Sequence, residues 1–125
     1  MISKLGQVML YVNNQEEAVE FWTDKLGFTV LADETAHGLR WIEVAPSAGA
    51  GTSIILHNKE AVAEMSPGLN LETPSLMFFT EDIEQLHQDL SSKNITVGEI
   101  VDMPTGKVFN FADGEENYFA VSERA

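Results

Sequence analysis

The chain has no cysteine, which excludes disulfide bridges and thiolate metal ligands. It also has no run of about 18 apolar residues of the kind that spans a bilayer. The first residues, Met1 to Gln7, lack the apolar segment of a secretory signal. From these absences we expect a cytoplasmic protein without a membrane-spanning helix.

Basic residues are scarce. Seven Lys and Arg stand against twenty Asp and Glu, and the formal net charge is −13. Such a field repels nucleic acid and anionic membrane surfaces, so we expect neither as a partner. The acids are spread along the chain, as is typical of a solvated surface. Two of the few cations, Arg40 and Lys107, are expected to pair with surface acids.

Several catalytic motifs are missing as well. The three histidines, His37, His57 and His87, form no His-x-x-x-His or His-Glu pair. No Gly-x-Ser-x-Gly elbow indicates a hydrolase triad. No glycine-rich phosphate loop is present, so a nucleotide cofactor is not expected.

The sequence does contain an internal repeat. Residues 7–30 follow the pattern of a strand, a capped amphipathic helix and a second strand, and residues 75–97 follow it again. The helix caps Asn14 and Asp82 are 82 − 14 = 68 residues apart, and the helix ends Gly27 and Asn94 are 94 − 27 = 67 apart. A long period that occurs twice predicts a duplicated half-domain.

Each half is predicted to be a βαβββ module. The whole chain, 1–125, is then one α+β domain made of half-modules at about 4–57 and 75–123, joined by connector 58–74. We expect a curved, mostly antiparallel sheet with the helices on its convex side. The predicted strands are 7–12, 28–32, 39–45, 52–57, 75–80, 96–100, 107–112 and 118–122, with a polar loop over 33–38 and a short helix over 60–65.

Side-chain alternation predicts which residues face the hollow of this sheet. If Ile42 and Val44 meet a helix, then Trp41 and Glu43 point the other way. By the same alternation, Gln7 and Met9 face the hollow if Leu10 and Val12 face the helix.

Three separated stretches now have a recognisable form. They are Val-Met-Leu-Tyr-Val-Asn-Asn…Phe-Trp…Leu-Gly-Phe-Thr-Val, Leu-Met-Phe-Phe-Thr-Glu-Asp-Ile, and Phe-Asn-Phe-Ala-Asp-Gly-Glu-Glu-Asn-Tyr-Phe-Ala-Val. With the duplication, they resemble the vicinal oxygen chelate superfamily, which includes glyoxalase I, extradiol dioxygenases and bleomycin-resistance proteins. The resemblance covers nearly the whole chain.

Enzymes of that superfamily hold a divalent metal in the hollow, with ligands from the first and last strand of each half. Carried over by position, the resemblance implies Gln7, Ser75, Ile54 (uncertain by one residue) and Ala120. Only Gln7 is a plausible ligand, because isoleucine and alanine side chains offer no lone pair. We therefore expect no metal cofactor, with a divalent metal as the alternative.

The leading hypothesis is a metal-free small-molecule binding protein, similar to the bleomycin-resistance branch, that sequesters or carries an apolar or aromatic ligand. The resemblance also implies a homodimer. Trp41 and Tyr118 are the favoured pocket walls. The expected ligand-binding residues are Gln7, Met9, Trp41, Glu43, Ile54, Ser75, Met77, Tyr118 and Ala120.

Two other interpretations stay open. One is a metal-dependent glyoxalase-like lyase, isomerase or dioxygenase that uses atypical donors such as Gln7, Glu43 and His57. In an enzyme, Glu43 is the candidate general base, although a solvated carboxylate is the simpler interpretation. The other is a scaffold whose acidic surface meets a protein partner.

Overall fold

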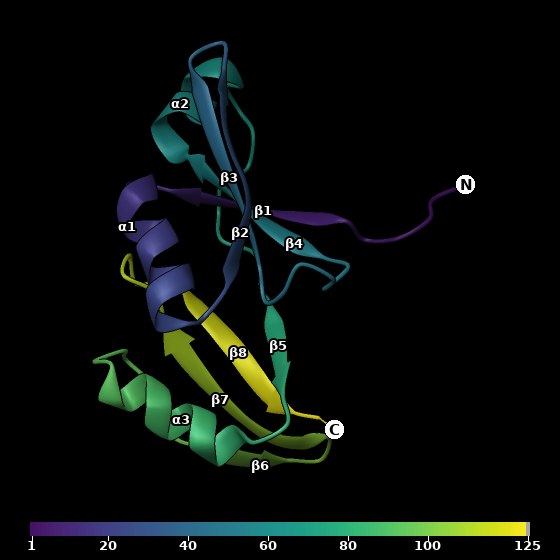
Figure 1. Cartoon of the computed structure of the whole chain (residues 1–125), viewed down its shortest axis with the longest axis vertical. Coiled ribbons are helices and arrows are strands. Elements are labelled where there is room, and N and C mark those ends of the chain that lie inside the picture. Colours follow the sequence, from purple (N-terminus) through teal and green to yellow (C-terminus); the bar gives the residue numbers. More distant parts are fainter. Residues whose placement is uncertain (125) are drawn as a thin grey trace. The chain divides into compact units, whose positions relative to one another are not determined.

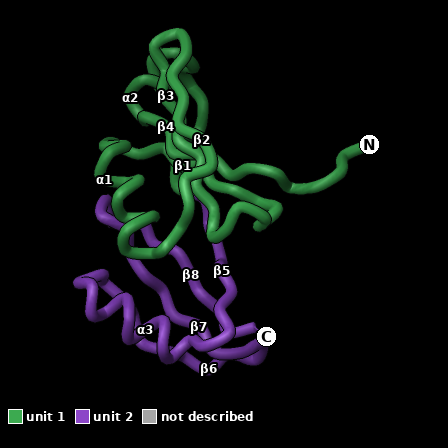
Figure 2. Tube along the Cα trace, viewed as in Figure 1, with its two compact units in different colours: residues 1–73 green, residues 74–125 purple. Residues whose placement is uncertain are grey.

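The computed structural model describes residues 1–124, which form two compact units (Figures 1 and 2). Unit 1 runs from Met1 to Thr73, and unit 2 begins at Pro74. Each unit holds a four-stranded mixed sheet and a helix in βαβββ order, so the predicted α+β class and the duplication are confirmed. No helix among the described residues is long and apolar enough to cross a membrane.

Unit 1 has the strand order β1-β4-β3-β2. β1 pairs with β4 in parallel, and the other neighbours pair antiparallel. Helix α1 packs on β3 and β4, and a short helix α2 follows β4. The elements are β1 (Gln7–Val12), α1 (Gln15–Glu20), η1 (Phe21–Lys25), β2 (Thr29–Ala36), β3 (Leu39–Ala45), β4 (Ser53–Asn58) and α2 (Lys59–Met65).

Unit 2 repeats this plan with the order β5-β8-β7-β6. β5 and β8 are parallel, as are their counterparts in unit 1. Helix α3 packs on β7 and β8. The elements are β5 (Met77–Thr80), α3 (Ile83–Ser92), β6 (Val101–Met103), β7 (Gly106–Ala112) and β8 (Tyr118–Glu123).

The helix ends follow from local chemistry. The Asn14 side chain accepts the backbone N–H of Glu17 at 3.0 Å, and Asp82 caps α3 in the same way. Gly27 (φ 77°) and Asn94 (φ 62°) supply the left-handed residues after each helix. The predicted caps and stops are thus confirmed, but the last turn of the first helix widens into the π-helical segment η1.

Alternate residues of each sheet form the core. Ile42 and Val44 of β3 are 0 % exposed, as is Trp22 on η1. In unit 2 the ring of His87 on α3 meets Phe109 of β7 edge-on, which shows that Phe109 faces the helix. The predicted alternation is therefore correct in both units. On the opposite face of unit 1, Met9 and Trp41 are exposed or half-buried, whereas Ile55 and Ser53 of the central strand β4 are buried.

Three predicted boundaries were wrong. β2 continues into the expected loop 33–38. Arg40 on β3 donates a hydrogen bond to Asp33 on β2, and the chain turns only at His37 and Gly38, which both have positive φ. The strand expected over 96–100 is reduced to one bridge between Val97 and Phe111, and β6 lies later. Ser75 precedes β5 rather than opening it.

Candidate ligand-binding site

One face of the unit 1 sheet points away from α1, and we call it the open face. Strand register arranges its residues in two rows across β1, β4 and β3. Met9, Ile55 and Glu43 form one row. Tyr11, His57 and Trp41 form the next, two residues further along each strand. Neighbouring residues in register share a face, so these side chains lie side by side.

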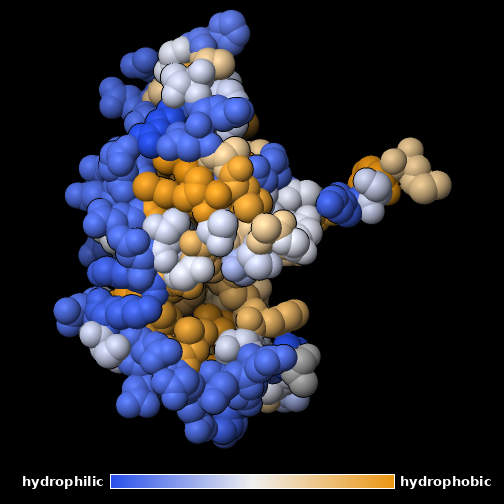
Figure 3. All heavy atoms as spheres, viewed as in Figure 1, coloured by the Kyte–Doolittle hydropathy of each residue, from blue (hydrophilic) through white to orange (hydrophobic). Residues whose placement is uncertain are grey.

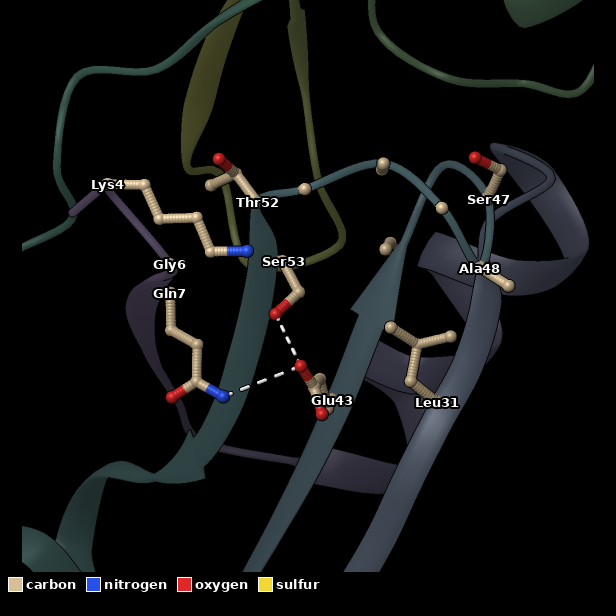
Figure 4. A pocket seen from close by; sticks show the side chains of 13 residues that line it. Lys4, Gly6, Gln7, Leu31, Glu43, Ser47, Ala48, Thr52 and Ser53 are labelled. Atoms are coloured by element: carbon tan, nitrogen blue, oxygen red, sulfur yellow. Dashed lines mark hydrogen bonds between the residues drawn. The ribbon is translucent and has the colours of Figure 1, made fainter.

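One end of the open face is polar. The Ser53 hydroxyl donates to Glu43 Oε2 at 2.6 Å, and the Gln7 amide donates to the same oxygen at 3.4 Å (Figure 4). Gln7 and Ser53 are partners across β1 and β4. The three side chains converge at the edge of a pocket of about 650 Å³, which is within the size range of small-molecule sites.

A β-bulge shapes this pocket. The register of β2 against β3 shifts between Val30 and Ala32, so Leu31 is the extra residue. Leu31 is 39 % exposed and lines the pocket beside Glu43 (Figure 4). Bulges often occur next to functional sites because they redirect side chains.

The other end of the open face is aromatic. The rings of Tyr11 and His57 stack with centroids 5.7 Å apart and an interplanar angle of 18°. Met9 places its sulfur 3.2 Å from His57 Nε2. Burial lowers the pKa of His57 below its ordinary value of 6.5, so the ring is neutral at physiological pH. We call this aromatic surface of Tyr11, His57 and Met9 the shelf.

The structure corrects one site residue. Ile54 is the β4 partner of Val44, so the strand register puts it on the helix-facing side, although both Ile54 and Ile55 are buried. Ile55, one position on, lies on the open face. Met9 pairs with Ile55, and its equivalent Met77 pairs with Ala120, so Ile55 is the true counterpart of Ala120.

Unit 2 has an open face of its own. Met77 and Tyr118 are 52 % and 60 % exposed there, and Ala120 lies between β5 and β7. Ser75 is exposed, outside the strand. Phe79 lies beside them with the Arg124 guanidinium 5.4 Å from its ring centroid. Predicted residues therefore reach the open faces of both units.

The donor set does not fit the metal site that the resemblance implies. The four positions hold an amide, a hydroxyl and the hydrocarbon side chains of Ile55 and Ala120, whereas divalent sites need several converging N or O donors. Within each unit, over residues 1–124, no group of three His, Asp or Glu side chains is placed to hold a metal ion. The alternative donors are also divided: Gln7 meets Glu43, but His57 lies at the aromatic end.

The two predicted surface cations do pair with acids. Arg40 binds Asp33 through two hydrogen bonds of 2.9 and 2.7 Å and also contacts Glu16. Lys107 binds Glu84 at 2.9 Å in the equivalent place of unit 2. Arg40 with Glu16 and Lys107 with Glu84 thus join each helix to its sheet.

Sequence reasoning missed Tyr11, Ser53 and Leu31 as site residues. Tyr11 could have been found, because it shares the alternation of Gln7 and Met9. Ser53 can be identified as a site residue only from the register of β4 against β1, and Leu31 only from the bulge in β2. Neither feature leaves a clear signal in a single sequence.

Comparisons with known proteins agree with this architecture. The family model for the Glyoxalase/Bleomycin resistance protein/Dioxygenase superfamily matches residues 4–121. The uncharacterized protein YetH of Bacillus subtilis (strain 168) is 33 % identical over 125 residues, covering 98 % of this chain and 100 % of that protein.

Among solved structures, TnmS3, an antibiotic binding protein from Streptomyces sp. CB03234, is 30 % identical with a TM-score of 0.84, covering 99 % of this chain and 98 % of that one. A glyoxalase/bleomycin resistance protein from the same Streptomyces is 27 % identical with a TM-score of 0.76, covering 95 % and 99 %. The chain therefore belongs to the glyoxalase/bleomycin resistance protein/dioxygenase superfamily.

Proposed function

We propose that this chain is a small-molecule binding protein that holds an apolar or aromatic ligand against the open face of unit 1 without a bound metal. One observation carries the proposal. A shelf of Tyr11, His57 and Met9 adjoins a polar pocket at Glu43 on the same sheet face. Ligand sites commonly combine an apolar wall with a few placed polar groups.

The shelf suits a flat ligand. Trp41 is half-buried and is the β3 partner of His57, so its indole extends the aromatic row. Aromatic pairs add about 0.5–1.5 kcal/mol beyond the burial of their area. Burial itself contributes roughly 25 cal/mol for each Å² of apolar surface removed from water. Binding would then depend on shape and apolar contact, and its role would be to sequester or carry the ligand.

Similarity supports the same class of function. TnmS3, 30 % identical along nearly its whole length, is described as an antibiotic binding protein. We extend small-molecule binding, and not a particular antibiotic, to this chain. The metal-dependent enzyme has less support, because hydrocarbon side chains stand where the superfamily's enzymes place ligands.

We also infer that the chain forms a homodimer. Large apolar side chains are exposed on unit 1, including Leu5 (68 %), Val30 (42 %) and Leu31 (39 %), and burying them against a second copy would remove apolar surface from water. Light scattering of the purified protein tests this inference.

A cytoplasmic location stays a prediction that cell fractionation can test.

The binding proposal is tested by a thermal-shift screen against planar aromatic antibiotics, because a ligand that binds only the native state raises the melting temperature. Trp41→Ala is expected to weaken the binding of a hit by about tenfold, from lost stacking and burial. Trp41→Phe should keep most of the affinity.

Met65→Ala is the matched control, since Met65 is 56 % exposed on α2, outside the open face. Circular dichroism checks that each variant folds. Equal affinities for Trp41→Ala and Met65→Ala would remove Trp41 from the site, and a panel without any hit would argue against the proposed function.

A further inference from the structure

The pocket at the polar end of the open face has an unusual feature, a carboxylate that is fixed but not neutralised. The pocket lies where β1, β3 and β4 meet the loop between β3 and β4 (Figure 4). Its lining is mostly small or neutral, with Glu43 on one wall and Lys4 at the N-terminal side. The residues around it include Gly6, Gln7, Leu31, Ala45, Thr52 and Ser53.

Glu43 is held through one oxygen only. Ser53 Oγ and Gln7 Nε2 both donate to Oε2, at 2.6 and 3.4 Å. Within residues 1–124 no group donates to Oε1, and Glu43 forms no ion pair, with Lys4 or any other cation. This differs from Asp33, whose two oxygens are both bonded by Arg40. A positioned carboxylate with a free oxygen is a strong acceptor for a charged donor.

The carboxylate also stands at a defined distance from the aromatic row. Glu43 and Trp41 are two residues apart on β3, and so are Ile55 and His57 on β4. Two residues of a strand span about 6.6 Å. A group that bonds Glu43 can therefore belong to a ligand whose ring lies on the aromatic shelf, if a short linker of two or three atoms joins them.

Resting on the proposed function, we infer that this pocket recognises a protonated amine, or a similar cationic donor, carried on a short arm by an aromatic ligand. Glu43 accepts the charged N–H, Ser53 and Gln7 fix the carboxylate, and the shelf receives the ring. The net charge of −13 favours the approach of such a cation.

The test is equilibrium dialysis of the full chain with three probes that share one ring: 2-(1-naphthyl)ethylamine, 2-(1-naphthyl)ethanol and 1-naphthylacetate. Measurements at 0.3 M salt suppress the general attraction of cations to an acidic protein. The amine is expected to bind about tenfold more tightly than the alcohol, and the acetate least.

Glu43→Gln is expected to bring the amine to the affinity of the alcohol and to leave the alcohol unchanged. Glu20→Gln is the matched control, because it removes the same charge from the exposed surface of the first helix. Ser53→Ala should give an intermediate loss, since it frees the carboxylate to move.

The outcomes separate the two proposals. If amine and alcohol bind equally, and Trp41→Ala weakens both, the cation preference is wrong while small-molecule binding stands. Equal losses of affinity for the amine in Glu43→Gln and Glu20→Gln would likewise overturn the proposed cation preference. If none of the three probes binds, the inference fails, and the proposed function must then stand or fall on the antibiotic screen.

Discussion

His57 shows how a single residue links the stability of the open face to pH. Its ring stacks on Tyr11 and contacts the sulfur of Met9, so a charged imidazolium would lose hydration without gaining an acid partner. Burial lowers its pKa below 6.5 in the folded chain. Well above pH 6.5 the His57 ring is neutral in both the folded and the unfolded chain. On acidification the unfolded chain binds the proton first, because its pKa is the higher of the two.

Stability should therefore fall as pH drops below about 6.5 and level off below the folded pKa of His57. Urea unfolding of the wild type and of His57→Gln, at pH 7.5 and 5.5, measures this. The variant cannot ionise, so it should lose less stability than the wild type on acidification. An NMR titration in which the His57 ring titrates at or above 6.5 would contradict the account.

Residue-level sequence reasoning succeeded where alternation alone decides the face. Gln7, Met9, Trp41 and Glu43 all lie on the predicted side of their strands. Ile54 failed, because a shift of one residue reverses the face of every side chain on a strand. No turn or polar pattern fixed the start of β4 closely enough to choose between adjacent isoleucines.

At the scale of elements, helices α1 and α3 are held by the same two devices. An Asn or Asp side chain caps its first turn, and a cation of the sheet pairs with an acid of that turn: Arg40 with Glu16 in unit 1, and Lys107 with Glu84 in unit 2. The outer surfaces of α1 and α3 are largely hydrophilic (Figure 3). The helices thus cover one face of each sheet and leave the other available.

The cap of α3 offers a direct check. Asp82→Ala removes the acceptor of the Gln85 N–H and should lower the free energy of unfolding by about 1 kcal/mol. Asp82→Asn keeps an acceptor and should cost much less. Gln88→Ala, an exposed change in mid-helix, should stay within about 0.5 kcal/mol of the wild type in urea unfolding. Equal stability of Asp82→Ala and Gln88→Ala would show that the cap contributes nothing.

Element types were predicted well because caps, stops and alternation are local signals. The π-helical turn at Phe21–Lys25 and the bulge at Leu31 were not predicted. Each of these irregularities inserts one residue into a regular hydrogen-bond pattern. The π-helical turn accompanies the packing of Trp22 in the core, and the bulge accompanies the pairing of β2 with β3. Tertiary packing of this kind is not visible in a single sequence.

At the scale of the whole molecule, the duplication gives each unit a buried face and an open face from nearly the same plan. The two open faces differ in chemistry. That of unit 1 carries Glu43 with its two donors, whereas that of unit 2 presents the exposed apolar side chains of Met77, Phe79 and Tyr118. We expect the specificity for a polar group to reside in unit 1.

The most direct test of the central claim is an amide NMR map of the chelator-treated protein, recorded with and without a compound from the antibiotic screen. Ligand-induced shifts should cluster on the open face of unit 1, at Met9, Tyr11, Trp41, Glu43 and His57, and should leave the outer turns of α1 unchanged. They should appear without any added metal. Shifts confined to other surfaces, or shifts that require a divalent cation, would contradict the account.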